Sequence, residues 1–360
     1  MKKQGTLKAL ISVAVVALIF FLAWLAEKEQ GASSMLVTVL KKGAVYALIA
    51  VSMNLLNGFT GLFSLGQAGF MLVGAYTYAV FTIPLAKRAA VYQYYAGGCV
   101  GIELNYIVAL VLAGVAAAIF AALIGLPVLR LKSDYLAIAT LGFAEIIRAI
   151  VQWDTLGPVT NGSNLLKTYP TFKTVMPGST VLFPFIVAGV CIGMILLLIN
   201  STYGRAFKAI RDDEIAAEAM GINLFHHKQM AFVISSFFAG VGGALLAMYQ
   251  GSLQANAFKS SMTYEILLIV VIGGMGSISG SVLASFLFIA CSEWWMRFLD
   301  NETFIGDFQI PLLGSGFRMV VFSVVIMIVV LFFRRGLMGD RELWNLRIPK
   351  KAKTREVTKA

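Results

Sequence analysis

Charged and imidazole side chains gather in one segment, Thr202–Gln229, and are the first residues of this sequence that could do chemistry. The segment holds four basic residues, four acidic residues and both histidines of the chain, between the uncharged runs Thr174–Gly204 and Gln229–Phe258. Two adjacent histidines do not make a metal site, and the sequence shows no zinc cluster, no nucleophile with a base and no paired catalytic acids. The pattern instead favours a water-exposed loop that docks another protein.

A short helix is predicted inside this central charged segment. Asp212, Asp213 and Glu214 suit the free N–H groups of a helix start, and Ile215–Met220 is strongly helix-favouring. Gly221 fits the residue after the helix end. The predicted helix has about two and a half turns, and its small apolar face would consist of Ala216, Ala217 and Met220. Packing of this face on the chain's own helices or on lipid is the alternative to docking.

Two opposite charges stand within a predicted membrane span. Glu145 and Arg148 are three residues apart, so they share a helix face and can form an ion pair. A charge at membrane depth is costly unless it is paired or wetted, which makes the pair a candidate for gating or for the solute pathway. If the span ends near Leu141, both residues are interfacial. The remaining membrane charges are predicted near outer span ends and are interpreted as interfacial: Glu265, Arg318 and the pair Glu293/Arg297.

Glycine-rich breaks interrupt two of the apolar runs, at Asn57–Gly69 and at Gly273–Gly280. Such breaks permit close helix packing, or broken helices whose free backbone groups line a cavity. The candidate pathway or gating residues at the breaks are Asn54, Asn57, Gly58, Gly61, Ser64, Gln67, Gly273, Gly274 and Gly276, with Thr60 as a further polar residue. For most of the polar ones, interhelical hydrogen bonding is the competing role.

Long apolar stretches must position these residues. The 360-residue chain is 59% hydrophobic and 13% charged, with a mean hydropathy of +0.83, whereas soluble domains carry roughly 25% charged residues. The stretches are too long for β-barrel strands and fit helices that cross a bilayer. The predicted fold is an all-α, polytopic transmembrane helical bundle of about ten spans: 8–26, 35–56, 65–83, 104–125, 134–152, 181–200, 229–250, 263–275, 277–298 and 316–333.

The distribution of basic residues predicts the orientation. With both termini in the cytoplasm, inside segments hold 18 Lys and Arg residues and outside segments hold 8, including Lys41 and Lys42, as the positive-inside rule requires. Those two lysines either snorkel to the outer headgroups or precede a later start of the second span. The net charge of +11 is therefore explained without nucleic acid. We expect one permease domain, 1–340, containing the loop 202–229, and a basic cytoplasmic tail, 341–360.

Several stretches resemble one family of membrane proteins. GRAFKAIRDDEIAAEAMGIN, followed by AFVISSFFAGVGGAL, resembles the cytoplasmic signature of ABC importer permeases of the branched-chain amino acid (LivM-type) family. The stretches Ser52–Tyr76, Leu131–Arg148 and Gly273–Phe286 agree in the same order, as does the outer segment Thr160–Leu166. One departure is that Ile215-Ala216-Ala217 stands where the general motif has Glu-Ala-Ala, with the acid at Glu214.

The resemblance implies an ABC importer permease fold and a function. Glu214–Gly221 would be the coupling helix that carries the ATPase cycle into the bundle, with Arg211, Asp212, Glu214, Ala216, Ala217, Met220 and Gly221 as coupling residues. The chain has no Walker A motif, so it is not an enzyme and needs no cofactor of its own; ATP would be bound by two cytoplasmic partner subunits. A second related permease, an extracytoplasmic binding protein carrying leucine, isoleucine or valine, and a bacterial inner membrane are the other expectations. A permease for urea, sugars or nucleosides, or an ion-coupled secondary transporter, are the alternatives.

Overall fold

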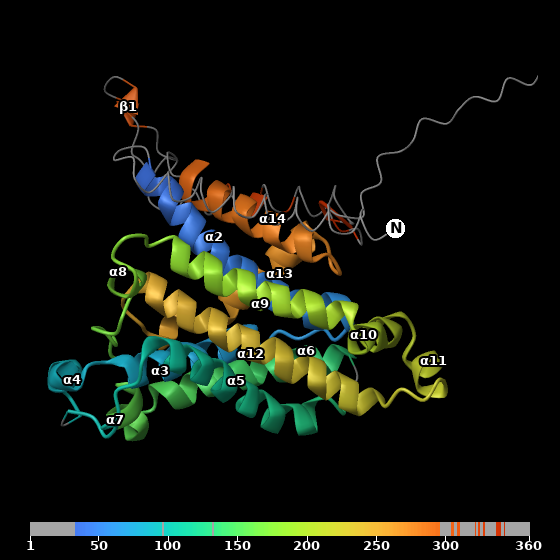
Figure 1. Cartoon of the computed structure of the whole chain (residues 1–360), viewed down its shortest axis with the longest axis horizontal. Helices are drawn as coiled ribbons and strands as arrows, with labels where there is room; N and C mark the ends of the chain where they lie inside the picture. Colours follow the sequence, from blue (N-terminus) through green and yellow to red (C-terminus); the bar gives the residue numbers. More distant parts are fainter. Residues whose placement is uncertain are drawn as a thin grey trace, which may run out of the picture.

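The computed structural model describes residues 33–95, 97–131 and 133–295, with short pieces beyond them (304–305, 308–309, 321, 323–324, 327, 336–339 and 342). Helices run side by side between one end that carries α4, α7 and α8 and an opposite end that carries α10 and α11 (Figure 1). The elements in order are α2 Ser33–Asn54, η1 Leu55–Phe59, α3 Gln67–Thr82, α4 Leu85–Val91, α5 Tyr106–Val128, α6 Ser133–Gln152, η2 Asp154–Leu156, α7 Gly157–Thr160, α8 Phe172–Val175, α9 Leu182–Asn200, α10 Thr202–Asp212, α11 Glu214–Ala219, α12 Leu224–Gln250, η3 Ala255–Ala257, α13 Ser260–Gly273, α14 Ile278–Ala290, η4 Cys291–Trp295, and the short antiparallel strands β1 Phe304–Ile305 and β2 Phe308–Gln309.

The helical bundle predicted from the sequence is confirmed within the described residues. Seven helices are long and apolar enough to cross a membrane, and the pair α3 and α4, bent by 120°, brings the number to 8 at most. These elements correspond to the eight predicted spans between 35–56 and 277–298. The first predicted span, 8–26, lies outside the described residues, and 316–333 lies almost entirely outside them. The total of about ten spans therefore stays a prediction.

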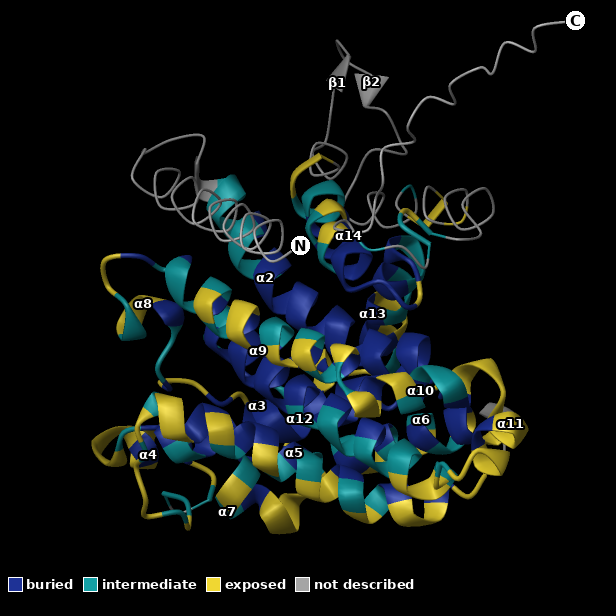
Figure 2. Ribbon diagram, turned by 45° about the vertical axis from the view of Figure 1, so that its right-hand side comes forward, coloured by how far each residue is buried: buried dark blue, intermediate teal, exposed yellow. Residues whose placement is uncertain are grey.

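Small residues let the central helices α12, α3 and α5 approach closely. A Cβ on Gly74 would lie 2.1 Å from the carbonyl oxygen of Gly240, and one on Gly243 would lie 2.0 Å from that of Met71. Close approach of this kind holds membrane helices together by dispersion contacts rather than by the exclusion of water. Helix α3 and the part of α12 from Ala231 to Met248 are accordingly mostly buried (Figure 2).

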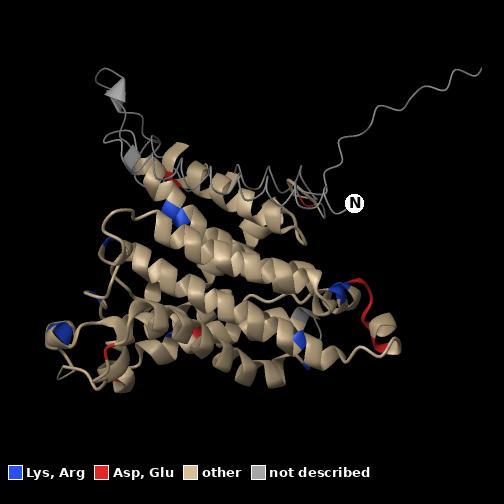
Figure 3. Cartoon of the chain, viewed as in Figure 1, with Lys and Arg blue, Asp and Glu red and all other residues tan. Residues whose placement is uncertain are grey.

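The outer faces of α5, α6 and α9 are apolar and exposed. Examples are Val111 on α5, Ile138 on α6 and Leu197 on α9, which are 50%, 68% and 75% exposed. Charged residues lie mainly at the two ends of the bundle, with few in its body (Figure 3). An apolar flank with charged ends is what a bilayer requires. The chain is therefore a multi-pass membrane protein.

The long segment between α6 and α9 folds over the end of the bundle that carries α4 and α8. Backbone groups of Leu166 and Leu253 exchange hydrogen bonds of 2.9 and 2.8 Å, and the Tyr78 hydroxyl donates to the Pro170 carbonyl at 2.9 Å. The Tyr95 hydroxyl donates to Asp154 Oδ1 at 3.0 Å, and this bond to a carboxylate raises the pKa of the Tyr95 phenol. This segment is therefore an ordered cover.

Candidate functional site

The central charged segment is mostly helical. Its first part forms α10, whose N-terminus is capped by the Ser201 side chain. One face of α10 is apolar, and its side chains Phe207 and Ile210 are 0% and 1% exposed, while Arg205 on the same helix is exposed. Burial of two large side chains on one face fixes how α10 lies on the bundle. The last part of the segment belongs to α12, which starts at Leu224, earlier than the predicted 229.

Caps define both ends of α11. The Asp213 side chain accepts hydrogen bonds from the backbone N–H groups of Ile215 and Ala216, at 2.9 and 3.0 Å. After the helix, Gly221 has φ +85°, Gly221 N donates to Glu218 O, and Ile222 N donates to Ala217 O. This pair of bonds is the Schellman motif, which needs a left-handed residue that glycine supplies without strain. The predicted caps are thus confirmed, but α11 has 6 residues, fewer than the predicted two and a half turns.

The predicted apolar face of α11 is divided in the structure. Ala217 is only 4% exposed and packs inward, whereas Met220 is 83% exposed and Ala216 is also exposed. Ile215, which was not on the predicted face, is 82% exposed. The outward apolar surface of α11 therefore consists of Ile215, Ala216 and Met220, and the expectation that Ala217 shares it is wrong. A helix start at Asp213 turns Ala217 towards the bundle.

Arg211, at the end of α10, contacts the first glycine-rich break. Its Nη1 donates to the Gly58 carbonyl oxygen at 3.0 Å, and its side chain is 32% exposed. A Cβ on Gly61, which has φ +75°, would lie 2.9 Å from Arg211 Cγ. Gly58 and Gly61 belong to the first of the two glycine-rich breaks, so Arg211 ties the end of α10 to that break. The neighbouring Asp212 lies at the surface, with its carboxylate 3.3 Å from the Arg211 guanidinium.

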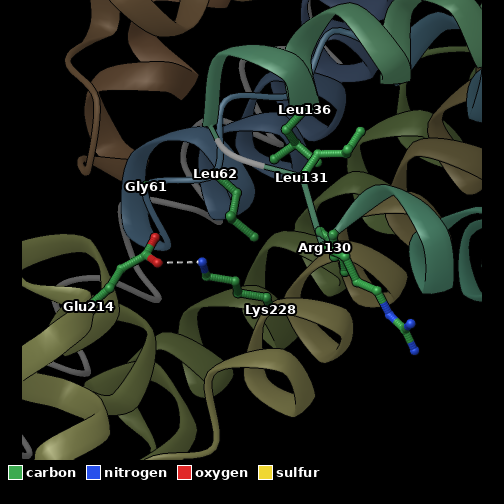
Figure 4. A pocket seen from close by; sticks show the side chains of 8 residues that line it. Gly61, Leu62, Arg130, Leu131, Leu136, Glu214 and Lys228 are labelled. Atoms are coloured by element: carbon green, nitrogen blue, oxygen red, sulfur yellow. Dashed lines mark hydrogen bonds and ion pairs between the residues drawn. The ribbon is translucent and has the colours of Figure 1, made fainter.

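A cavity of about 320 Å³ opens beside this contact. Figure 4 shows Glu214 and Lys228 facing each other, with the Arg130 guanidinium pointing away from them. The Lys228 amine lies 2.6 Å from Glu214 Oε2, so this ion pair joins the first residue of α11 to α12. Glu214 has an internal partner here, and Asp213, not Glu214, caps α11. The other lining residues are Gly61, Leu62, Leu129, Leu131 and Leu136.

The two glycine-rich breaks dock on each other through Asn54. Its Nδ2 donates to Ser277 O at 2.9 Å, to Ser281 Oγ at 2.8 Å and to Gly274 O at 3.4 Å, and its Oδ1 accepts from Gly276 N at 2.9 Å. Asn54 is 0% exposed, so losing these bonds would leave a buried amide unsatisfied. A backbone approach this close has no room for a side chain on Gly58, whose Cβ would lie 1.8 Å from Asn54 Oδ1.

The other polar residues of the first break are also buried and bonded. Asn57 and Ser64 bond to each other through side chain and backbone at 3.2 and 3.3 Å, and Gln67 Nε2 donates to Ser52 Oγ at 2.7 Å. Thr60 Oγ1 donates to the Leu55 carbonyl at 3.0 Å. These bonds favour the packing and hydrogen-bonding alternative for the polar residues of the break. At the second break, Gly273 packs directly on the backbone of Gly280.

Glu145 and Arg148 form the predicted ion pair, with Arg148 Nε 2.8 Å from Glu145 Oε2. Helix α6 continues to Gln152, so the helix does not end near Leu141 and both residues lie within it. Ser260 at the start of α13 donates to Glu145, and Arg148 donates to Asn256 Oδ1 at 3.3 Å. The pair is therefore part of a polar cluster between α6 and α13, near the end of α6.

Glu265 differs from the expectation for the membrane charges, and Glu293, Lys41 and Lys42 have partners in the structure. Helix α13 starts at Ser260 and the candidate span at Ala255, so Glu265 lies near the middle of the span rather than at its outer end. Glu293 pairs with Lys42 of α2, while Arg297 and Arg318 lie outside the described residues. Because α2 begins at Ser33, both Lys41 and Lys42 lie within this helix. Lys41 Nζ donates to Thr180 Oγ1 at 2.9 Å.

Glu342 is a contact residue that sequence reasoning missed. Its carboxylate accepts from Ile278 N at 2.8 Å and from Ser279 N at 3.0 Å, and so caps the N-terminus of α14 next to the second break. Just upstream, Leu337 N donates to the Ile272 carbonyl at 2.7 Å. Ile278-Ser279 follows Ser277, an N-cap signal, but no local pattern links it to an acid 64 residues away.

Comparison with known proteins covers most of the chain. A family model described as branched-chain amino acid transport system / permease component matches residues 35–333. The high-affinity branched-chain amino acid transport system permease protein LivM of Escherichia coli (strain K12) is 32% identical over 307 residues, 78% of this chain and 67% of the relative.

Two further relatives are more distant. A probable branched-chain amino acid transport permease protein LivM of Methanocaldococcus jannaschii is 23% identical over 87% of this chain and 95% of its own. The corresponding LivH protein of Salmonella typhimurium is 22% identical over 84% of this chain and 93% of its own. No solved structure gives a significant match.

Proposed function

Because the chain belongs to the family of branched-chain amino acid transport permeases, we propose that it is one permease subunit of an ATP-driven ABC importer of leucine, isoleucine and valine. The observation that carries the proposal is the match along residues 35–333, which includes α11 and both glycine-rich breaks. The solute class comes from the relatives, which are named as branched-chain amino acid transport permeases. The chain itself performs no reaction on the solute; it supplies a passage whose two ends open in turn.

We propose α11 as the surface that an ATP-binding subunit holds. Ile215 and Met220 stand free at the end of the bundle, on a helix of 6 residues. A helix this short has little stability by itself in water, and here caps and the buried Ala217 hold its shape. An apolar surface presented by a fixed backbone is suited to a groove on a partner.

A movement of α11 would be transmitted to the two glycine-rich breaks through the contact of Arg211 with the first break. The contacts run from α11 through α10 to the Gly58 carbonyl, and from the first break through Asn54 to Gly276 of the second. Both breaks end helices within the bundle, where a small change of angle could open or close a passage. We assign Arg211 and Asn54 to this relay, with Gly58, Gly61, Gly273, Gly274 and Gly276 as the residues that allow the close contacts.

The proposed complex has four kinds of protein, of which this chain is one. Two cytoplasmic ATP-binding subunits would bind ATP, which this chain has no motif to hold. A second permease related to the LivH proteins would form the other half of the passage, in keeping with the likeness to both LivM and LivH sequences. A binding protein would deliver solute to the ordered cover between α6 and α9. The bilayer would be a bacterial inner membrane, with both termini and α11 on the cytoplasmic side.

Reconstitution tests this proposal. The permease pair, its ATP-binding subunits and the binding protein are placed in liposomes without any ion gradient, and uptake of radiolabelled leucine is measured with ATP supplied to the ATPase side. We expect uptake with ATP and none with a non-hydrolysable analogue or with a Walker A lysine variant of the ATPase. Unlabelled isoleucine and valine should compete.

Two outcomes would contradict the proposal. Uptake that competes with urea, a sugar or a nucleoside but not with isoleucine or valine would keep the ATP-driven class and change the solute. Uptake by the chain alone under a proton or sodium gradient, without ATPases, would replace the class by an ion-coupled transporter.

A further inference from the structure

In the described part of the chain, the charged side chains of the candidate spans, apart from Lys228 near the start of α12, lie on one side of the bundle. Helices α5 and α9, whose apolar faces are exposed, contain no Asp, Glu, Lys or Arg. The charges lie instead on α6, α13, α2 and η4, which are linked by contacts: Ser260 of α13 donates to Glu145 of α6, and Lys42 of α2 pairs with Glu293 of η4. Helix α13 lies between the two groups.

Glu265 is the least compensated of these charges. It is exposed and lies near the middle of the candidate span Ala255–Gly273, within electrostatic range of Lys42 and Glu293. Lys42 already pairs with Glu293, so the three groups carry a formal charge of −1. Within the described part of the chain, Glu265 has no salt bridge and no hydrogen bond of its own.

A carboxylate in this position cannot face lipid cheaply. Placing a charged side chain at the centre of a bilayer is costly because the charge loses its hydration, so such residues face a protein interior or water. The surface around Glu265 is exposed in this chain: Ser261 is exposed and Tyr264 is 48% exposed. Water is therefore the environment that this face of α13 requires.

We propose that the exposed face of α13 lines the water-filled passage, and that Glu265 is the side chain there that meets the ammonium group of a passing amino acid. This inference rests on the proposed function for the solute, but the placement of the passage does not depend on which solute is carried. A zwitterion brings a positive charge that Glu265 can pair with, and an excess of one negative charge favours that approach. The apolar faces of α5 and α9 are left for lipid.

Labelling with a thiol reagent tests the placement of the passage. Tyr264→Cys and the control Ile186→Cys are made in the assembled complex, in lipid nanodiscs. Both residues are fifth in helices that start at the same end of the bundle, and they are 48% and 43% exposed. A charged, membrane-impermeant methanethiosulfonate is added. Peptide mass spectrometry then measures the extent of labelling at residue 264 or 186 separately from labelling at the native cysteines. Only a thiolate reacts.

We expect residue 264 to react at least about tenfold faster than residue 186, because an apolar setting suppresses thiolate formation. Equal, slow reaction at both positions would show that the exposed face of α13 does not line the passage. This holds both if lipid covers the face and if a dry contact with the second permease covers it. If leucine uptake fails in the wild-type complex while residue 264 is labelled, the proposed solute is wrong and the passage stands. The two failures are thus distinguishable.

Substitution of Glu265 tests its contact with the ammonium group. Glu265→Gln should raise the KM for leucine about tenfold, as expected for loss of a bond to a charged group, while Glu265→Asp retains most of the affinity. Gel-filtration profiles of both variants check that the complex assembles. A Glu265→Gln complex that assembles and transports with the wild-type KM would overturn this role. If the Gln variant does not assemble, a wild-type KM for Glu265→Ser, which also lacks the charge, would overturn it equally.

Discussion

The contact between Arg211 and the first glycine-rich break gives the sharpest prediction about coupling. Arg211→Ala removes the 3.0 Å hydrogen bond to the Gly58 carbonyl and the side-chain contact at Gly61. A hydrogen bond from a charged group contributes about 1.5–3 kcal/mol. Because the side chain is 32% exposed, solvent screening reduces this to about 1–2 kcal/mol. That free energy corresponds to about a five- to thirtyfold change in an equilibrium between two states of the relay.

The measured quantity is the number of leucine molecules taken up per ATP hydrolysed in liposomes. We expect Arg211→Ala to leave the ATP-binding subunits bound and hydrolysing, but to lower this ratio about five- to thirtyfold. Arg205→Ala is the matched control, since Arg205 has the same charge on the same helix but its side chain makes no hydrogen bond or salt bridge within the described part of the chain. An Arg211→Ala ratio equal to that of Arg205→Ala would refute the relay through Gly58.

Two further predictions concern the breaks and are read from the thermal unfolding midpoint of the purified complex. Gly58→Ala would place a Cβ 1.8 Å from Asn54 Oδ1, so it should destabilise by at least about 2 kcal/mol. Gly142→Ala on α6, with open space around the new methyl group, should be neutral or stabilise by up to about 1 kcal/mol; similar midpoints for the two variants would contradict the close docking. Glu342→Ala removes the carboxylate that accepts from Ile278 N and should cost about 1–2 kcal/mol, and an unchanged midpoint would show that the cap contributes nothing.

Features that depend on neighbouring residues could be predicted from the sequence. The apolar runs are long enough to identify the spans in the described part of the chain, and the caps of α11 follow from Asp213 and Gly221, each within a few residues of the helix. The Glu145–Arg148 pair follows from helical spacing alone. Each of these features depends on residues that are close together in the sequence, so it can be predicted from a single short stretch.

Features that depend on distant parts of the chain could not be predicted. Both breaks are visible as glycine-rich stretches, but their docking rests on Asn54 and Gly276, which are 222 residues apart. The contact of Arg211 with Gly58 depends on how α10 packs on the bundle. The burial of Ala217 depends in the same way on how α11 packs. Glu265 is predicted near a span end because the predicted span begins at residue 263, whereas α13 begins at Ser260 and the candidate span at Ala255.

The measurement that tests the central claim most directly is cross-linking from α11 in the assembled complex. A photoreactive phenylalanine derivative replaces Met220, which is 83% exposed, and after irradiation the adducts are identified by mass. A control places the same group at Tyr94, which is 77% exposed at the opposite end of the bundle. The account predicts an adduct between position 220 and an ATP-binding subunit, and none from position 94. Absence of that adduct from position 220, in a complex that transports leucine, would contradict the assignment of α11 as the coupling helix.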